Sequence, residues 1–177
     1  MLLAIHTCGT AGSVALGRAN DDRTEVRLLA QAMLPSRGYA AHLNPRISEL
    51  LAGQRATLQE IEAIVVVSGP GSFTGIRVGL SAAKGLAQPA GIPLISLSRL
   101  ELIARVSGLP HVLAAVDAGR GDYYVGDYRE SGEIVEKLLS QAETLAALRQ
   151  PGAAILVYEQ AYEPVVEDKT SALAAYH

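Results

Sequence analysis

The segment Ser68–Ala87, which reads SGPGSFTGIRVGLSAAKGLA, constrains the fold more than any other part of the sequence. It follows the wholly apolar run Ile64–Val67, and a run of this kind is typical of a strand in the middle of a buried parallel sheet. The Gly-Pro-Gly at 69–71 ends that strand, since glycine and proline together favour a turn of defined shape. A helix from about Thr74 to Gln88 is predicted to follow.

Small residues recur at every fourth position through this segment, at Gly71, Gly75, Gly79 and Ala83. This spacing places them in one row on the helix, which we call the glycine row. A glycine inside a helix costs about 1 kcal/mol relative to alanine, so the row must serve packing or a ligand. Neither Gly-x-x-x-x-Gly-Lys-Ser/Thr nor Gly-x-Gly-x-x-Gly fits, which favours packing over phosphate binding. The row could pack against the chain's own sheet or against a partner's helix.

Length, composition and charge exclude several classes of protein. A chain of 177 residues can bury one large core or two small ones, and 49% hydrophobic with 19% charged residues is typical of a compact, soluble protein. The net charge of -3 argues against a broad basic surface that binds nucleic acid unaided. The single cysteine, Cys8, cannot form an internal disulfide, and no apolar stretch approaches the length of a membrane span. We therefore expect a cytoplasmic protein with no membrane segment.

The first half of the sequence alternates strands and helices. Asn44 can cap a helix with Pro45 at its first position, although a start near Ala40 with a kink at Pro45 is the alternative. Ser72 and Ser98 are placed to cap later helices, the second in a capping box with Glu101. Capping boxes are also predicted for Thr57 with Glu60 and for Ser140 with Glu143. The expected strands cover residues 2–5, 13–17, 25–30, 64–67 and 93–97, and the later helices cover 74–88 and 98–106.

The second half repeats this layout in shortened form. His111–Asp117 echoes the opening strand, and strands at 122–128, 134–138 and 154–158 follow, with a helix from Ser140 to Arg149 between the last two. Residues 159–177 are expected to be irregular, with a helical turn at 170–176. Three antiparallel strands followed by parallel strands with crossover helices, used twice, predict the α/β, ribonuclease-H-like lobes shared by actin, Hsp70 and sugar kinases. The expected lobes are residues 1–107 and 108–177.

On these residues the sequence resembles the bacterial TsaB (YeaZ) family, whose members take part in making threonylcarbamoyladenosine at position 37 of tRNA. The resemblance rests on Ser68–Ala87, Gly91–Leu94, Ser98–Glu101, Val112–Asp117 and Arg120–Tyr124, and it fades beyond Tyr128. It implies a non-catalytic scaffold that binds the TsaD transferase, pairs with itself when alone, and meets a TsaE-like ATPase and tRNA only through the complex. It implies that the chain binds no cofactor by itself, and it leaves open a nucleotide bound at the interface with a partner.

The resemblance also implies which residues form the partner interface. Carried over from the family, they are Gly71, Phe73, Gly75, Arg77, Val78, Gly79, Ala82 and Ala83. In this interpretation the glycine row admits a partner's helix, so burial of the row inside its own chain would overturn the scaffold assignment as derived from the row. The sequence departs from the family at His6, where an aspartate is usual, and between Arg37 and His42, where Arg-x-His-Ser is usual. Its C-terminal lobe is also shorter.

Residues that could carry chemistry are few. The four histidines include no His-x-x-x-His metal-binding pair, and His6 with Cys8 is better explained by strand geometry than by a metal site. Asp117 could bind Mg²⁺, but a role in capping its own turn and pairing with Arg120 is favoured. No catalytic or metal residue is therefore assigned. The alternative function, an ATP-dependent phosphotransferase or ATPase of the actin and sugar-kinase superfamily, rests on the duplicated fold, Asp117 and the glycine loop.

Overall fold

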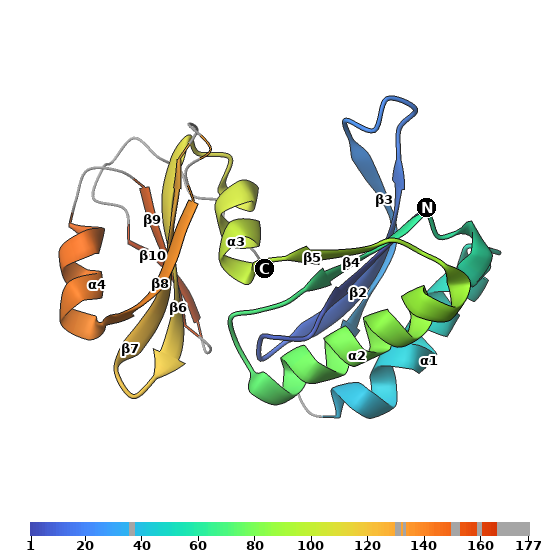
Figure 1. The fold of residues 1–177 in the computed structure, drawn as a ribbon, viewed down its shortest axis with the longest axis horizontal. Helices are drawn as coiled ribbons and strands as arrows, with labels where there is room; N and C mark the ends of the chain where they lie inside the picture. Colours follow the sequence, from blue (N-terminus) through green and yellow to red (C-terminus); the bar gives the residue numbers. More distant parts are fainter. Residues whose placement is uncertain (36–37, 130–131, 133, 150–152, 159–160, 166–177) are drawn as a thin grey trace. The chain divides into compact units, whose positions relative to one another are not determined.

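The computed structural model describes residues 1–35, 38–129, 132, 134–149, 153–158 and 161–165. The chain divides into two compact units, Met1–Leu97 and Ser98–His177 (Figure 1). Each unit contains one five-stranded sheet in its described part. Of the helices in the described residues, not one combines the length and the apolar character needed to cross a membrane. The mixed α/β architecture predicted from the sequence is confirmed.

The sheet of the first unit has the strand order β3-β2-β1-β4-β5. Its strands are β1 (Leu2–His6), β2 (Gly12–Ala19), β3 (Val26–Leu34), β4 (Ala63–Val67) and β5 (Leu94–Leu97). Strands β1, β2 and β3 pair antiparallel with one another, whereas β4 is parallel to β1 and β5 is parallel to β4. In this register Ile5 lies opposite both Val14 and Val66. These side chains share one face of the sheet, because paired residues point the same way.

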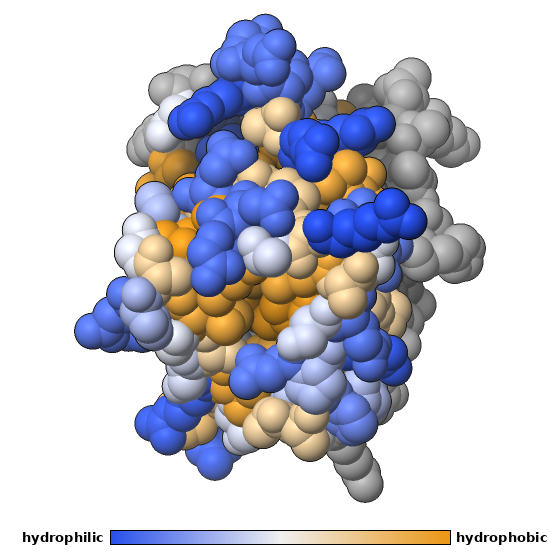
Figure 2. All heavy atoms as spheres, turned by 90° about the vertical axis from the view of Figure 1, so that its right-hand side faces the viewer, coloured by the Kyte–Doolittle hydropathy of each residue, from blue (hydrophilic) through white to orange (hydrophobic). Residues whose placement is uncertain are grey.

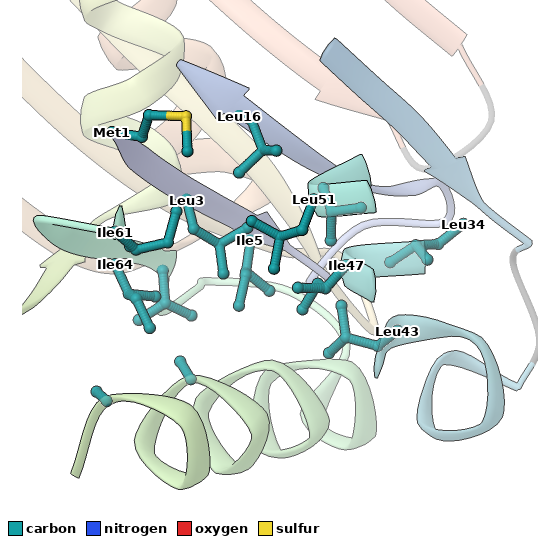
Figure 3. Packing of buried hydrophobic residues seen from close by; sticks show 14 of the residues in the cluster. Met1, Leu3, Ile5, Leu16, Leu34, Leu43, Ile47, Leu51, Ile61 and Ile64 are labelled. Atoms are coloured by element: carbon teal, nitrogen blue, oxygen red, sulfur yellow. The ribbon is translucent and has the colours of Figure 1, made fainter. Parts of the chain in front are cut away.

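Two helices cover that face (Figure 1). They are α1 (Tyr39–Gly53) and α2 (Phe73–Ala90), and α2 is the crossover that makes β4 and β5 parallel. Every fourth residue of α1 enters the core, at Leu43, Ile47 and Leu51. Figure 3 shows these side chains converging with those of β1, β2 and β4 between the sheet and the helices. The core of this unit therefore lies on the α1 and α2 side of the sheet.

The start of α1 corrects one expectation and bears out its alternative. The helix begins at Tyr39, so the start predicted at Asn44 and Pro45 is wrong, and Pro45 lies inside the helix. Tyr39 is buried, and its hydroxyl donates a hydrogen bond to the carbonyl oxygen of Gly9 at 2.9 Å. This contact ties the first turn of α1 to the turn after β1.

The second unit repeats the strand arrangement of the first. Its strands are β6 (His111–Gly119), β7 (Asp122–Arg129), β8 (Ile134–Ser140), β9 (Ala153–Tyr158) and β10 (Ala161–Val165). Their order, β10-β9-β6-β7-β8, matches that of the first unit, and β9 is parallel to β6 as β4 is to β1. The fifth strand differs, because β10 is antiparallel to β9. The irregular segment expected after Tyr158 is therefore wrong for 161–165, whereas the turn expected at 170–176 lies outside the described residues.

The boundary between the units falls before α3 (Arg99–Ser107), not after it as expected. The helix lies in the second unit because its apolar side packs on β6 and β7: Leu100 and Ala104 join a buried cluster with Val112, Val116 and Tyr128. On the opposite face of this sheet Ala115, Tyr123 and Val125 form a second cluster. The other helix described in this unit, α4 (Gln141–Leu148), contacts β7 and β8.

The predicted helix caps are largely observed. Ser140 and Glu143 form a capping box at α4, and Thr57 and Glu60 form one at the 3₁₀ turn η1 (Leu58–Glu60), with Glu60 accepting from the Thr57 amide at 2.7 Å. Ser98 caps α3 by accepting from the Leu100 amide at 3.2 Å. The capping box predicted with Glu101 is not formed, and the Glu101 carboxylate instead pairs with Arg105 at 2.7 Å. Such caps satisfy backbone donors that have no partner within the helix.

A partly exposed hydrogen-bond network joins β7, β8 and the start of α3. The Tyr128 hydroxyl and the Ser98 hydroxyl both donate to Oε1 of Glu136. Burial of Tyr128, followed by its hydrogen bond to the Glu136 carboxylate, raises the pKa of the Tyr128 phenol above its ordinary 10.0. The folded state therefore favours the neutral phenol.

Tyr128→Phe is expected to lower the free energy of unfolding by about 1–2 kcal/mol at pH 7, because a hydrogen bond to a charged acceptor is lost. Since the folded-state pKa is raised, the contribution of the neutral phenol is fully present below pH 10 and declines as the pH rises above it. The difference between wild type and variant should therefore narrow above pH 10. Urea unfolding from pH 7 to pH 11 measures it, with Tyr124→Phe, a half-exposed neighbour on β7, as the control.

Candidate functional site

The glycine-rich loop between β4 and α2 has a fixed shape. Gly69 adopts φ +108°, and a Cβ there would lie 2.8 Å from Cδ1 of Ile76. Ser72 caps α2 as predicted, since its hydroxyl accepts from the Gly75 amide at 3.2 Å. The Ser72 amide in turn donates to the carbonyl oxygen of Cys8 at 2.7 Å, joining the loop to the end of β1. The Ser72 and Gly75 amides at this helix start are thus bonded within the chain.

The glycine row faces the chain's own sheet. Gly75, Gly79 and Ala83 are buried, and the hydroxyl of Thr7 donates to the Gly75 carbonyl oxygen at 2.7 Å. A Cβ on Gly75 would lie 1.9 Å from the Thr7 carbonyl oxygen, and one on Gly79 would lie 2.3 Å from Thr7 Oγ1. The glycines let α2 approach the end of β1 closely. Packing was therefore correctly favoured for the row, but its assignment to a partner's helix is wrong.

The remaining interface residues expected from the resemblance lie at different depths. Val78 and Ala82 are partly buried and pack against the core of the first unit, and Gly71 is half-buried in the loop. Phe73 and Arg77 are exposed, Phe73 by 67%, and the Arg77 guanidinium carbon lies 3.7 Å from the centroid of the Phe73 ring. Of the eight residues, these two are the exposed ones.

The side of α2 opposite the glycine row forms the candidate docking surface. Its exposed members, which we call the outer face of α2, are Phe73, Thr74, Arg77, Ser81, Lys84, Gly85 and Gln88. Ser81, Gly85 and Gln88 were not singled out from the sequence. The sequence nevertheless contains a signal for this surface: polar residues at 77, 81, 84 and 88 recur at helical spacing, which indicates the side of α2 that is exposed to water.

Gly85 is unlike the glycines of the row. A Cβ at Gly85 would meet nothing within 4 Å, and the residue lies in the interior of the helix on an exposed side. A helical glycine costs about 1 kcal/mol relative to alanine, and here no contact within the described chain offsets that cost. A bare position of this kind lets a second helix approach the backbone of α2.

The charge on this side of the first unit is positive. The α2 sequence contains no aspartate or glutamate, and Arg77 and Lys84 both lie on its outer face. The adjacent helix α1 contributes Arg46 and Glu49, which pair with each other at 2.6 Å. The outer face of α2 is therefore a small, basic, partly apolar surface on a protein whose net charge is -3.

The other candidate residues are engaged in local structure. Asp117 accepts from the Gly119 amide at 2.7 Å, which confirms its role in the turn after β6. The expected ion pair with Arg120 is not formed between these two described residues. Within the described ranges, no three His, Cys, Asp or Glu side chains are grouped closely enough to hold a metal ion. Tyr123 is buried and Tyr124 is exposed, as the strand alternation predicts.

Exposed apolar side chains occur elsewhere on the surface too. Figure 2 shows apolar side chains gathered in the middle of one face, with hydrophilic side chains around them. On β3, Val26, Leu28 and Met33 are each more than half exposed. Exposure alone thus does not select the docking surface, whereas the combination of Gly85, Phe73 and two cations distinguishes the outer face of α2.

Comparison with known proteins places this fold in a family. The family model described as TsaD, tRNA N6-adenosine threonylcarbamoyltransferase, matches residues 33–167, which is most of the chain. The chain belongs to this family. Within it, the chain is 37% identical over 148 residues to the tRNA threonylcarbamoyladenosine biosynthesis protein TsaB of Escherichia coli, covering 78% of this chain and 62% of that protein. The TsaB assignment made from the sequence is confirmed.

Two further relatives agree with the assignment to TsaB. The TsaB protein of Haemophilus influenzae is 38% identical over 127 residues, covering 70% of this chain and 51% of that protein. A solved structure of YeaZ from Pseudomonas aeruginosa superposes with a TM-score of 0.69 at 27% identity, covering 89% of this chain and 83% of that one. The chain spans 62% and 51% of the lengths of its two TsaB relatives.

Proposed function

We propose that this chain is a non-catalytic accessory subunit that binds a TsaD-type transferase in the N6-threonylcarbamoyladenosine modification of tRNA. Its identity of 37% to a protein named for threonylcarbamoyladenosine biosynthesis is the observation that carries the proposal. The docking surface is the outer face of α2, since the glycine row is used inside the chain. Two copies pair through the same face when the transferase is absent, and a TsaE-type ATPase and tRNA join only through the complex, in the cytoplasm.

An accessory role is supported by how the candidate catalytic groups are used. Asp117, the carboxylate on which a phosphotransferase of this fold would depend, is held by the amide of its own turn, and His6 stands where the family usually has an aspartate. The isolated chain should therefore show no Mg²⁺-dependent hydrolysis of ATP above the level of an Asp117→Ala variant. Hydrolysis that disappears in Asp117→Ala would assign the chain to the phosphotransferase class instead.

Complex formation tests the proposal directly. The full chain is mixed with the TsaD-type subunit from the same source at about 10 µM, and the mass of the eluted complex is measured by light scattering. A heteromeric complex with equal numbers of the two chains is expected. Two separate peaks at this concentration, with both proteins folded by circular dichroism, would contradict the proposal.

A further inference from the structure

Arg77 and Lys84 give the outer face of α2 a positive charge that is not balanced by any carboxylate of the described residues. In the part of the chain that the structure describes, no carboxylate lies within ion-pair distance of either residue. The one exposed acid on the adjacent helix, Glu49, is already paired with Arg46 at 2.6 Å. Arg77 is held against the Phe73 ring, so its guanidinium is placed before any partner arrives.

This charge has opposite consequences for two kinds of partner. A symmetric pair of identical copies joined through this face brings the same surface patch of each copy together, so two positively charged patches meet. At a separation of about 4 Å, two unit charges interact by about 1 kcal/mol even in water. A different chain that carries carboxylates opposite Arg77 and Lys84 turns the same charges into attractive contacts.

We propose that Arg77 and Lys84 select the occupant of this face: a partner chain that presents carboxylates, in preference to a second copy of this chain. The inference rests on the proposed function, and it adds the charge of the matching surface on the TsaD-type subunit. Cationic side chains at the rim of an interface act against wrong partners as much as they favour the right one. The face thus disfavours the self-pair and leaves the chain available for the heteromeric complex.

The sign of the salt dependence separates the two kinds of pairing. Raising NaCl from about 50 mM to about 300 mM screens exposed charges, so binding to the TsaD-type subunit should weaken by about fivefold. Self-association of this chain should strengthen over the same range, because the screened interaction is repulsive. Sedimentation velocity for the self-pair and calorimetric titration for the heteromeric pair measure both. The same sign of salt dependence for the two equilibria would overturn the proposal.

Charge reversal supplies the matched test. Arg77→Glu/Lys84→Glu should weaken binding to the TsaD-type subunit by about tenfold, since attraction becomes repulsion. The control, Arg120→Glu/Lys137→Glu, reverses two exposed cations of the second unit and changes the net charge equally, from -3 to -7. It should bind as wild type does. If both variants lost the same affinity for the TsaD-type subunit, or neither lost any, the proposal that charge selects the partner would be overturned. The proposed formation of the complex would not be contradicted by either result.

A mixture of wild type and the Arg77→Glu/Lys84→Glu variant tests the charge without the transferase. Opposite charges then meet across the face, so mixed pairs should form about tenfold more tightly than pairs of either protein alone. If the mixture associates no better than its components, the proposal is wrong. Because this measurement does not involve the TsaD-type subunit, its result is separate from a failure of the proposed function, which would appear as no heteromeric binding at any salt concentration.

Discussion

Gly75→Ala is expected to lower the free energy of unfolding by about 3 kcal/mol. The added Cβ would lie 1.9 Å from the carbonyl oxygen of Thr7, and both atoms belong to backbone or are fixed to it. Either α2 must move off the end of β1 or β1 must bend. Both responses disturb the hydrogen bond from the Thr7 hydroxyl to the Gly75 carbonyl oxygen.

Two other glycines of α2 give graded controls for this effect. Gly79→Ala brings a Cβ to 2.3 Å from the hydroxyl oxygen of Thr7, a side-chain atom that can rotate away, so a loss of about 1–2 kcal/mol is expected. Gly85→Ala meets nothing within 4 Å and should stabilise the protein by about 0.5–1 kcal/mol through helix propensity alone. Urea unfolding followed by circular dichroism ranks the three variants. A stability of Gly75→Ala equal to that of Gly85→Ala would contradict the inward orientation of the row.

Gly85→Leu is expected to reduce the affinity for the TsaD-type subunit by about a hundredfold without loss of fold. The position is open, so leucine fits the isolated chain and favours the helix. In the complex, two packed helices lie about 8–10 Å apart depending on the side chains between them, and a leucine at a bare position holds the partner away. Calorimetric titration against wild type measures the loss.

The matched control places the same side chain on another exposed helix position. Ala146 on α4 is exposed, so Ala146→Leu adds similar apolar surface to the second unit. Its affinity for the TsaD-type subunit should equal that of wild type. If Gly85→Leu and Ala146→Leu bind equally well, α2 does not form the interface.

Phe73→Ala, which removes an exposed ring from the outer face, should weaken binding to the TsaD-type subunit by about tenfold.

Local signals in the sequence were sufficient for most of the fold. Thr57 with Glu60, Ser140 with Glu143, and Ser72 before the glycine-rich helix each form the cap that their spacing predicts. These signals succeed because a cap involves residues only two or three positions apart. The repeated strand pattern likewise predicted the two similar sheets, since alternation of buried and exposed residues is a local property of each strand.

The corrections arise where distant contacts decide. The Asn44-Pro45 pair has the composition of a helix start, but Tyr39 is held by the turn after β1, thirty residues earlier in the chain, and α1 begins there. The strand β10 forms through backbone hydrogen bonds to β9, and the residue pattern of 161–165 does not predict this pairing. The position of α3 in the second unit depends on Leu100 and Ala104 packing against β6.

For the glycine row, the sequence predicts which residues share a side of α2 but not what that side contacts. Spacing establishes that Gly75, Gly79 and Ala83 share one side of α2, but it does not say what that side meets. The answer comes from Thr7, whose carbonyl and hydroxyl occupy the space that side chains at Gly75 and Gly79 would fill. The polar series on the other side of the helix, with Arg77 and Lys84, then becomes the surface available to a partner.

The most direct test of the central claim, that the outer face of α2 docks against a TsaD-type subunit, is site-specific photo-crosslinking. A photoreactive residue replaces Ser81, in the middle of the outer face, and in a parallel protein it replaces Lys137 on β8. With the TsaD-type subunit present, irradiation should join the two chains from position 81 and not from position 137. The account would be contradicted if position 137 crosslinked to the TsaD-type subunit while position 81 gave no crosslinked product, although the Ser81-substituted protein was folded.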